Sequence, residues 1–205
     1  MNIKGIANKL LKCHQEFKDT KRTYIVGIDG LGGAGKTTFA KKLQQYLSPH
    51  VHITLVHLDD HIVERKRRYN TGQPEWYEYY FFLQWDIALL RKDLFCRLHN
   101  TPKELFLPFY SKEDDLVSIK EIEVVPRSIT LIEGVFLQRP EWREYLDLAI
   151  YLSCPNEIRR ERVLRRDVYI GDEKAILDKY KNRYWLAEDY YFNHVNPQKS
   201  ADYIL

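Results

Sequence analysis

The chain has 205 residues, 44% of them hydrophobic and 30% charged, a balance typical of one soluble globular domain over residues 1–205. No apolar run is long enough to span a membrane, and a net charge of +3 is too small to indicate a nucleic-acid partner by itself. The three cysteines form no C-x-x-C pair, which argues against a disulfide framework or a zinc site and favours the reducing cytoplasm.

The first segments of the chain predict a helix, a strand and a second helix. Residues 1–11 alternate polar and apolar side chains without the apolar stretch of a secretory signal, so we expect an amphipathic helix there. Residues 23–28 are mostly apolar and predict a buried parallel strand, and residues 38–47 carry apolar side chains at helical spacing. The segment between this strand and this helix carries the strongest motif of the chain.

That segment, residues 30–37, reads GLGGAGKT and matches the phosphate-binding pattern G-x-x-x-x-G-K-[ST] at every fixed position. Its glycines let successive backbone amides form an anion nest, which the helix N-terminus closes. We expect Lys36 to reach the β- and γ-phosphates of a nucleotide and Thr37 to ligate the bridging Mg²⁺. The alternative is an ordinary glycine-rich turn, which the flanking strand and helix disfavour. The predicted nucleotide-binding residues are Gly30, Gly32, Gly33, Ala34, Gly35, Lys36, Thr37 and Thr38.

Further apolar segments alternate with helical ones along the rest of the chain. This alternation predicts an α/β fold of the P-loop NTPase type, with a mostly parallel five-stranded sheet between two helical layers. Ligands of such sheets bind at the carboxyl ends of the strands, so polar residues that follow strands are candidate site residues. The additional segments typical of strands are 51–58, 104–110, 129–132, 148–152 and 202–205.

Two carboxylates, Asp59 and Asp60, directly follow the predicted strand 51–58. Phosphoryl transfer to a hydroxyl needs an acceptor for the hydroxyl proton and oxygen ligands for Mg²⁺. Asp59 is nearer the strand end and is the candidate for the catalytic base, for metal binding and for contact with the acceptor. The alternative is that the pair caps a following helix or starts a turn.

A third carboxylate, Glu133, follows the apolar strand 129–132. A carboxylate at the end of a buried strand is costly unless it is paired, hydrogen-bonded or bound to metal. Glu133 is therefore predicted to lie on the metal side of the site, together with Thr37 and Asp59. The alternative is a glutamate that caps the next helix.

Residues 155–167 predict a helix with five arginines. Arg162 and either Arg165 or Arg166 share one helical face, which suits a mobile lid over the γ-phosphate. Arg162 and Arg166 are the candidates for stabilising the transferred phosphoryl group, in a lid region over roughly residues 155–190. The alternative is an exposed helix with ion pairs such as Glu161 with Arg165.

These residues, in this order, resemble the uridine kinase family of P-loop small-molecule kinases, within the phosphoribulokinase and uridine kinase superfamily. The resemblance implies ATP as donor, Mg²⁺ as cofactor, a hydroxyl acceptor, and a parallel sheet with a lid. It also implies that Asp59 is the base, that Glu133 helps to hold the metal, and that Tyr110 lines the acceptor pocket rather than only the core. The matching segments are 27–38, 59–60, 85–86, 107–110, 133–134, 162–167 and 200–204.

The acceptor side departs from the nucleoside-kinase pattern. That pattern carries a base-reading histidine after its tyrosine, whereas residues 111–115 contain none, and the lid continuation at 168–173 lacks glycine-flanked arginines. Contacts to a phosphate on the acceptor would then come from Arg183 or from the basic run 65–68, which includes Arg68. The alternative for that run is a solvated surface. Asp86, in the matching segment 85–86, is a further candidate for acceptor binding.

The leading functional hypothesis is an ATP-dependent kinase that phosphorylates a hydroxyl of a nucleoside, uridine-like, or of a related small metabolite. One alternative is a nucleotide-operated switch, although no Asn-Lys-x-Asp segment follows a later strand; another is a kinase or ATPase acting on nucleic acid. The expected partner is a small hydroxyl acceptor, with neither a membrane nor a nucleic acid favoured. A group of aromatic residues lines either the acceptor cavity or a contact in a homo-oligomer: Trp76, Tyr77, Tyr79 and Tyr80.

Overall fold

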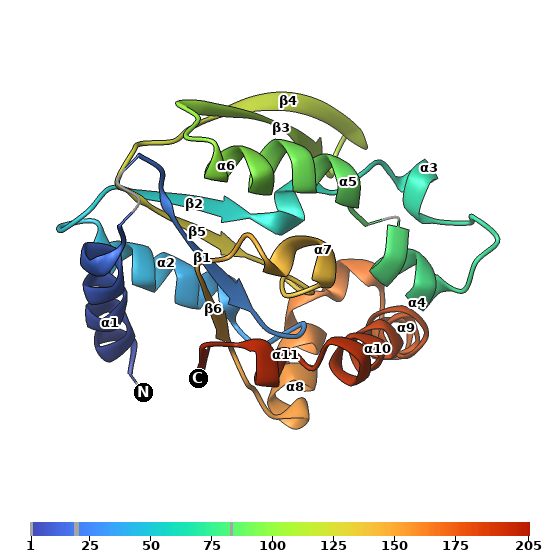
Figure 1. Ribbon diagram of the computed structural model, residues 1–205. Helices are drawn as coiled ribbons and strands as arrows, with labels where there is room; N and C mark the ends of the chain where they lie inside the picture. The colour runs from blue at the N-terminus through green and yellow to red at the C-terminus, as the bar shows by residue number, and fades with distance from the viewer. Residues whose placement is uncertain (1, 19–20, 83) are drawn as a thin grey trace.

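The computed structural model describes residues 2–18, 21–82 and 84–205, and it has a five-stranded parallel sheet at its centre (Figure 1). The strand order is β2-β5-β1-β6-β7, and every neighbouring pair is parallel. The predicted α/β fold and the five-stranded parallel sheet are therefore confirmed. The strands of this sheet are β1 (Tyr24–Asp29), β2 (Ile53–His57), β5 (Ile129–Glu133), β6 (Leu148–Tyr151) and β7 (Tyr203–Ile204).

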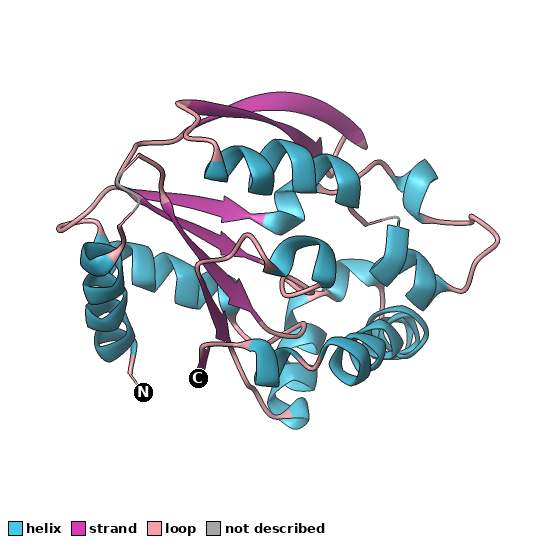
Figure 2. Ribbon diagram, viewed as in Figure 1, coloured by secondary structure: helices cyan, strands magenta, loops and turns pink. Residues whose placement is uncertain are grey.

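Helices cover both faces of the sheet (Figure 2). Because side chains alternate along a strand, Val26 of β1 packs with α1 (Ile3–Glu16) and α2 (Lys36–Leu47), whereas Ile25 belongs to the core on the opposite face. That opposite face is covered by α5 (Ile87–Leu90), η3 (Arg91–Cys96), α6 (Arg97–His99), α7 (Pro140–Arg143) and α10 (Trp185–Val195).

The first helix extends further than the sequence pattern predicted. It spans Ile3–Glu16, and the Asn2 side chain caps it by accepting a hydrogen bond from the Gly5 amide at 2.9 Å. Ile6 and Leu10 are fully buried against the sheet, in agreement with an amphipathic helix. Among the described residues, no helix is both long enough and apolar enough to cross a membrane.

One predicted strand lies outside the central sheet. Residues 104–110 belong to β3 (Glu104–Ser111), which pairs antiparallel with β4 (Leu116–Glu123) in a separate two-stranded sheet. The assignment of 104–110 to the parallel sheet was therefore wrong. A tight connection at 112–115 joins the two strands, and such a connection can form only between antiparallel neighbours. β4 is mostly exposed, so it lacks the apolar run that identified the other strands.

The remaining helices lie in the connections that follow β2 and β6, and most of them are short. Between β2 and β3 lie η1 (Leu58–His61), α3 (Arg65–Arg68), α4 (Glu75–Tyr77) and η2 (Glu78–Phe82). After β6 come α8 (Asn156–Arg166), η4 (Val168–Ile170), α9 (Glu173–Lys179), η5 (Tyr180–Tyr184) and, beyond α10, α11 (Pro197–Ser200).

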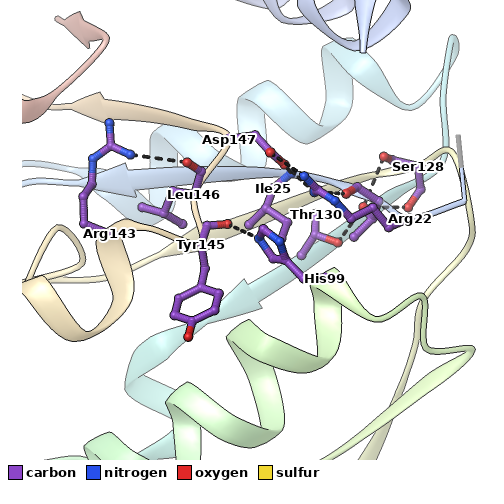
Figure 3. A network of polar contacts seen from close by, with 10 residues as sticks. Arg22, Ile25, His99, Ser128, Thr130, Arg143, Tyr145, Leu146 and Asp147 are labelled. Carbon is purple, nitrogen blue, oxygen red and sulfur yellow. Dashed lines mark hydrogen bonds and ion pairs between the residues drawn. The ribbon is translucent and has the colours of Figure 1, made fainter. Parts of the chain in front are cut away.

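A polar network holds together the amino-terminal ends of the strands, at the edge of the sheet opposite Asp59 and Glu133 (Figure 3). Two nitrogens of Arg22 donate to the two carboxylate oxygens of Asp147, each at 2.7 Å, and Asp147 also accepts from the Ile25 amide at 2.8 Å. Asp147 directly precedes β6, and Arg22 lies two residues before β1. The pair therefore holds the starts of these neighbouring strands together.

Candidate active site

The phosphate-binding loop lies between β1 and α2, as the sequence predicted. Gly33 has φ = 79°, in the left-handed region that favours glycine, and an added Cβ would lie 2.8 Å from the Arg159 carbonyl oxygen. Lys36 donates from Nζ to the Leu31 carbonyl at 3.2 Å, across the loop. Burial lowers the pKa of Lys36, and the carboxylates of Glu133 and Asp59 act against that shift.

This loop forms one wall of a cavity of about 950 Å³ at the carboxyl ends of β1, β2 and β5. The structure brings most of the predicted site residues to this cavity. Those that line it are Gly32, Gly33, Gly35, Lys36, Thr37, Thr38, Asp59, Arg68, Tyr110, Glu133, Arg162 and Arg166. Gly30 and Ala34 belong to the same loop without lining the cavity.

Glu133 ends β5 and is 6% exposed. Its Oε1 accepts hydrogen bonds from Thr37 Oγ1 at 2.8 Å and from His57 Nδ1 at 2.7 Å. Burial acts to raise the pKa of Glu133, but the His57 hydrogen bond and the Lys36 charge outweigh it, so the net shift is downward. Glu133 is thus held as a carboxylate, and none of the described residues hydrogen-bonds to its second oxygen.

His57 is a site residue that the sequence analysis missed. It is the last residue of β2, and the strand register places it beside Glu133 in the neighbouring strand. The hydrogen bond to Glu133 raises the pKa of His57, although partial burial opposes the shift. Knowledge that β2 and β5 are neighbours would have revealed this residue, because both strands end at the same level.

Asp59 lies in η1, directly after β2, and its side chain faces the cavity. No side chain makes a capping hydrogen bond at the start of η1, so the alternative of a helix cap finds no support. The surrounding protein excludes bulk water and raises the pKa of Asp59; Lys36 acts in the opposite direction and Glu133 adds to the rise. Asp60 lines the same cavity.

The chain segments that follow β2 and β5 pack closely against each other, which keeps Asp59 and Glu133 on the same side of the cavity. Gly134 follows Glu133, and a Cβ added to it would lie 2.6 Å from the Leu58 Cβ. Only a residue without a side chain allows the chain after β5 to pass Leu58 so closely.

The three arginines of α8 that were considered for the lid, Arg162, Arg165 and Arg166, have different environments. Arg162 Nη1 donates to the Gly33 and Ala34 carbonyls at 3.0 and 3.3 Å, so it contacts the phosphate-binding loop itself. Arg165 forms an exposed ion pair with Glu161, as the alternative interpretation of this helix expected.

Arg166 is held by Asp167 and Tyr180. Its Nε and Nη2 donate to the Asp167 carboxylate at 2.7 and 3.0 Å, and Nη2 also lies 3.1 Å from the Tyr180 hydroxyl. These contacts orient a guanidinium group at the edge of the cavity.

A buried ion pair that the sequence analysis also missed links the loop to the lid region. Glu188 of α10 accepts from the Gly32 amide at 2.6 Å and from Arg159 Nη1 at 2.8 Å. The same Arg159 nitrogen donates to the Gly32 carbonyl at 3.1 Å. Burial raises the pKa of Glu188, and Arg159 opposes the shift. The only sequence signal was an acidic residue among the aromatic residues of α10.

Tyr110 and Arg68 form the opposite side of the cavity. Arg68 Nη2 donates to the Tyr110 hydroxyl at 2.9 Å, and that hydroxyl donates to Asp115 Oδ1 at 2.9 Å. Tyr110 lines the cavity through this polar network, so it is more than a core tyrosine. Of the four aromatic residues noted in the sequence, Tyr79 alone is among the lining residues that the structure describes.

Two predicted acceptor-binding residues lie away from the cavity lining. Asp86 caps α5, accepting from the Leu89 amide at 3.0 Å, and pairs with Arg67. Arg183 is fully buried, donates to the Arg68 carbonyl at 3.1 Å and pairs with Glu78 at 3.4 Å. The structure does not bring either side chain to the site, because each is committed to local structural contacts.

The oxygen ligands at the loop suit Mg²⁺. The Thr37 hydroxyl and the Glu133 carboxylate meet beside the phosphate nest, and among the described residues no group of three or more His, Cys, Asp or Glu side chains forms a closed metal cage. Mg²⁺ characteristically takes one or two protein oxygens together with substrate phosphates and water.

Comparisons with known proteins agree with this arrangement. The model of the Phosphoribulokinase / Uridine kinase family matches residues 25–205. The uridine kinase of Borreliella burgdorferi (strain ZS7) is 27% identical over 188 residues, which cover 88% of this chain and 85% of that protein. The uridine kinase of Lactobacillus helveticus (strain DPC 4571) is 28% identical over 195 residues, which cover 90% and 87%.

Among solved structures, one described as a possible uridine kinase from Bacillus stearothermophilus matches with a TM-score of 0.80 and 40% identity, and the match covers the whole of both chains. The motif order, the family match over most of the sequence and the shared fold lead to one conclusion. The chain belongs to the phosphoribulokinase and uridine kinase family of phosphotransferases that act on a hydroxyl group.

Proposed function

We propose that this protein transfers the γ-phosphoryl group of ATP to a hydroxyl of a nucleoside or a related small metabolite, with Mg²⁺ as cofactor. One observation carries the proposal: the phosphate-binding loop, Asp59 and Glu133 open onto the same cavity. These groups follow the carboxyl ends of three neighbouring parallel strands, β1, β2 and β5. The carboxyl edge of the sheet is where α/β proteins bind their ligands.

The donor's phosphates would lie in the nest of loop amides. Lys36 would contact the β- and γ-phosphates, and Arg162 and Arg166 would stabilise the negative charge on the transferred group. These cations would orient the phosphoryl group for in-line attack, which is the main catalytic contribution that a protein makes to this reaction.

Thr37 and Glu133 would hold Mg²⁺, with Asp59 as a further ligand or as the base. When bound, Mg²⁺ neutralises charge on the β- and γ-phosphates. His57 would act on Glu133 rather than on the metal, because its hydrogen bond fixes the direction of that carboxylate.

Asp59 would accept the proton of the attacking hydroxyl. A bond forms between the acceptor oxygen and the γ-phosphorus, the bond from that phosphorus to the β,γ-bridging oxygen breaks, and ADP leaves. A raised pKa makes Asp59 a stronger base than an ordinary aspartate, which favours proton transfer near neutral pH.

The test is a screen of nucleosides and phosphorylated metabolites as acceptors, with ADP release measured above the background without acceptor. We expect at least one acceptor to raise ADP release well above background and to be recovered as its phosphate ester. ADP release that no acceptor in the panel increases would contradict the proposal. Lys36→Ala serves as the matched control, because the loss of its ammonium group should weaken nucleotide binding.

A further inference from the structure

The wall of the cavity opposite the phosphate-binding loop is rich in cations. Arg65 and Arg68 of α3, Lys112 of the β3–β4 connection and Lys179 at the end of α9 all line the cavity. Within the described ranges, none of the four makes a salt bridge to a carboxylate. Arg166, which lines the same cavity, is by contrast paired with Asp167.

Arg68 is the centre of this group. It is 7% exposed, and its guanidinium lies over the rings of Tyr69 and Tyr110, with centroid distances of 5.2 and 5.0 Å. Nε donates to the Val63 carbonyl and Nη2 to the Tyr110 hydroxyl, both at 2.9 Å. Nη1 makes no hydrogen bond to any described residue, so it is the nitrogen that remains for a ligand in the cavity.

The other three cations are held around Arg68 by neighbouring groups. Arg65 Nη2 donates to the Lys112 carbonyl at 2.6 Å, which joins α3 to the β3–β4 connection. Lys112 Nζ lies 3.4 Å from the centroid of the Tyr169 ring, and Lys179 Nζ lies 5.5 Å from that of Tyr69. Aromatic faces thus position the ammonium groups without neutralising them.

Carboxylates nearby do not cancel this charge. Asp115 interacts electrostatically with Arg65 and Arg68 and accepts hydrogen bonds from the Arg65 backbone amide and the Tyr110 hydroxyl, but it forms no salt bridge with either arginine, and a single carboxylate offsets only part of the charge of four cations. Asp167, which acts electrostatically on Lys112, is already bound to Arg166 through two hydrogen bonds. A buried guanidinium that forms no direct salt bridge is unfavourable, and an anionic ligand would relieve that cost.

We propose that the acceptor of this kinase carries an anionic group, a phosphate or a carboxylate, in addition to the hydroxyl that is phosphorylated, and that Arg68, Arg65, Lys112 and Lys179 bind that group. This inference rests on the proposed function. A neutral nucleoside has no charge to place against four cations. Arginine is also the residue best suited to planar, bidentate recognition of phosphate and carboxylate.

Matched acceptors test the inference. ADP release is measured with ribose and ribose 5-phosphate, with glycerol, glycerol 3-phosphate and glycerate, and with uridine. We expect the charged member of at least one series to have a kcat/KM at least tenfold above that of its neutral parent. Comparing glycerol 3-phosphate with glycerate shows whether the site prefers a phosphate or a carboxylate. A preference for uridine or a neutral polyol would overturn the inference and leave the proposed function intact. Absence of stimulation by every compound would contradict both.

Variants connect the preference to these residues. Lys112→Gln and Lys179→Gln change exposed or half-buried side chains, so they should fold, and Arg68→Lys keeps the buried charge but loses the planar fork. We expect each to raise the KM for the charged acceptor by roughly tenfold, the value of one charge-assisted hydrogen bond. Lys66→Gln is the matched control, because Lys66 lies exposed on the same helix and does not line the cavity. Equal KM values for the Lys66 variant and all three others would overturn the assignment.

Discussion

Glu188 accepts a hydrogen bond at 2.6 Å from the backbone amide of Gly32, a residue 156 positions earlier in the chain. Helix α10 is thereby attached to the phosphate-binding loop. Arg159 of α8 donates hydrogen bonds both to Glu188 and to the Gly32 carbonyl, so it joins the same contact. The shape of the loop depends on the lid region as well as on its own glycines.

Glu188→Ala should weaken nucleotide binding and lower stability together. The change releases the Gly32 amide and leaves the buried Arg159 without its carboxylate, a loss that commonly costs about 3 kcal/mol or more. We expect roughly a tenfold weaker affinity in a titration with a fluorescent ATP analogue, and a clearly lower unfolding midpoint in urea. Asp189→Ala, at the exposed neighbouring position, is the control. Equal behaviour of the two variants would show that the Gly32 contact has no role in shaping the loop.

Asp59→Asn should abolish turnover while ATP binding is largely kept. A general base typically contributes a factor of about 10² to 10⁴, and asparagine preserves the size of the side chain without accepting a proton. Steady-state ADP release with the best acceptor gives kcat, and the analogue titration gives nucleotide affinity. Turnover within about threefold of the wild type would remove Asp59 from the role of base.

Asp147→Ala should destabilise the fold without changing the chemistry. The change removes the carboxylate that binds two nitrogens of Arg22 and the Ile25 amide, and both side chains of the pair are at most 14% exposed. We expect the free energy of unfolding to fall by about 3 kcal/mol, measured by urea denaturation. Asp147→Asn, which keeps an acceptor for Ile25, should lose less.

The same variant separates stability from catalysis. The Arg22 and Asp147 pair lies at the amino-terminal side of the sheet, away from the cavity. At a temperature where the variant is still folded, its kcat should therefore equal that of the wild type. A large fall in kcat would show that this end of the sheet affects the site.

Asp29 should make the stability decrease as the pH rises above the acidic range. Burial raises its pKa, although hydrogen bonds from Tyr191, Gln138 and the Gly30 amide oppose the shift. The native state therefore binds more protons than the unfolded chain, whose aspartate pKa is about 3.9. The stabilising contribution of protonated Asp29 is complete below that pH and is lost as the pH rises through the folded-state pKa.

Asp29→Asn removes this titration. We expect the free energy of unfolding of the variant, minus that of the wild type, to increase between pH 4.5 and pH 8 in urea denaturation, because the wild type alone loses stability as Asp29 ionises. A difference that stays constant over this range would contradict the assignment of the pH dependence to Asp29.

The sequence was sufficient where a pattern is local. The loop around Lys36 follows from eight consecutive residues, and Asp59 and Glu133 follow from the rule that polar residues after parallel strands meet at one edge. The strand at 104–110 was misassigned because an apolar run does not reveal whether its partner is parallel or antiparallel. That information lies in β4, whose exposed residues give little signal.

The missed residues share a different cause. His57 meets Glu133 across 76 positions, and Glu188 meets Gly32 across 156. Such pairs depend on strand order and helix packing, which no local pattern contains. Arg183 shows the opposite error. The sequence made it a candidate for ligand binding, but the structure buries it fully, with its guanidinium hydrogen-bonded to the Arg68 carbonyl.

β2 and β5 are hydrogen-bonded neighbours, so the chain leaves the sheet after one strand and returns on the strand beside it. Most of the wall around Arg68 is built during that excursion, by α3 and the β3–β4 hairpin, whereas Thr37, His57 and Glu133 belong to the sheet and its first loop. The described residues of the same excursion, among them Trp85, Leu90 and Phe95, also belong to the core that packs against one face of the sheet. One segment thus builds both a wall of the cavity and the packing beneath the sheet, so a substitution in it that reshapes the wall must also preserve those apolar contacts.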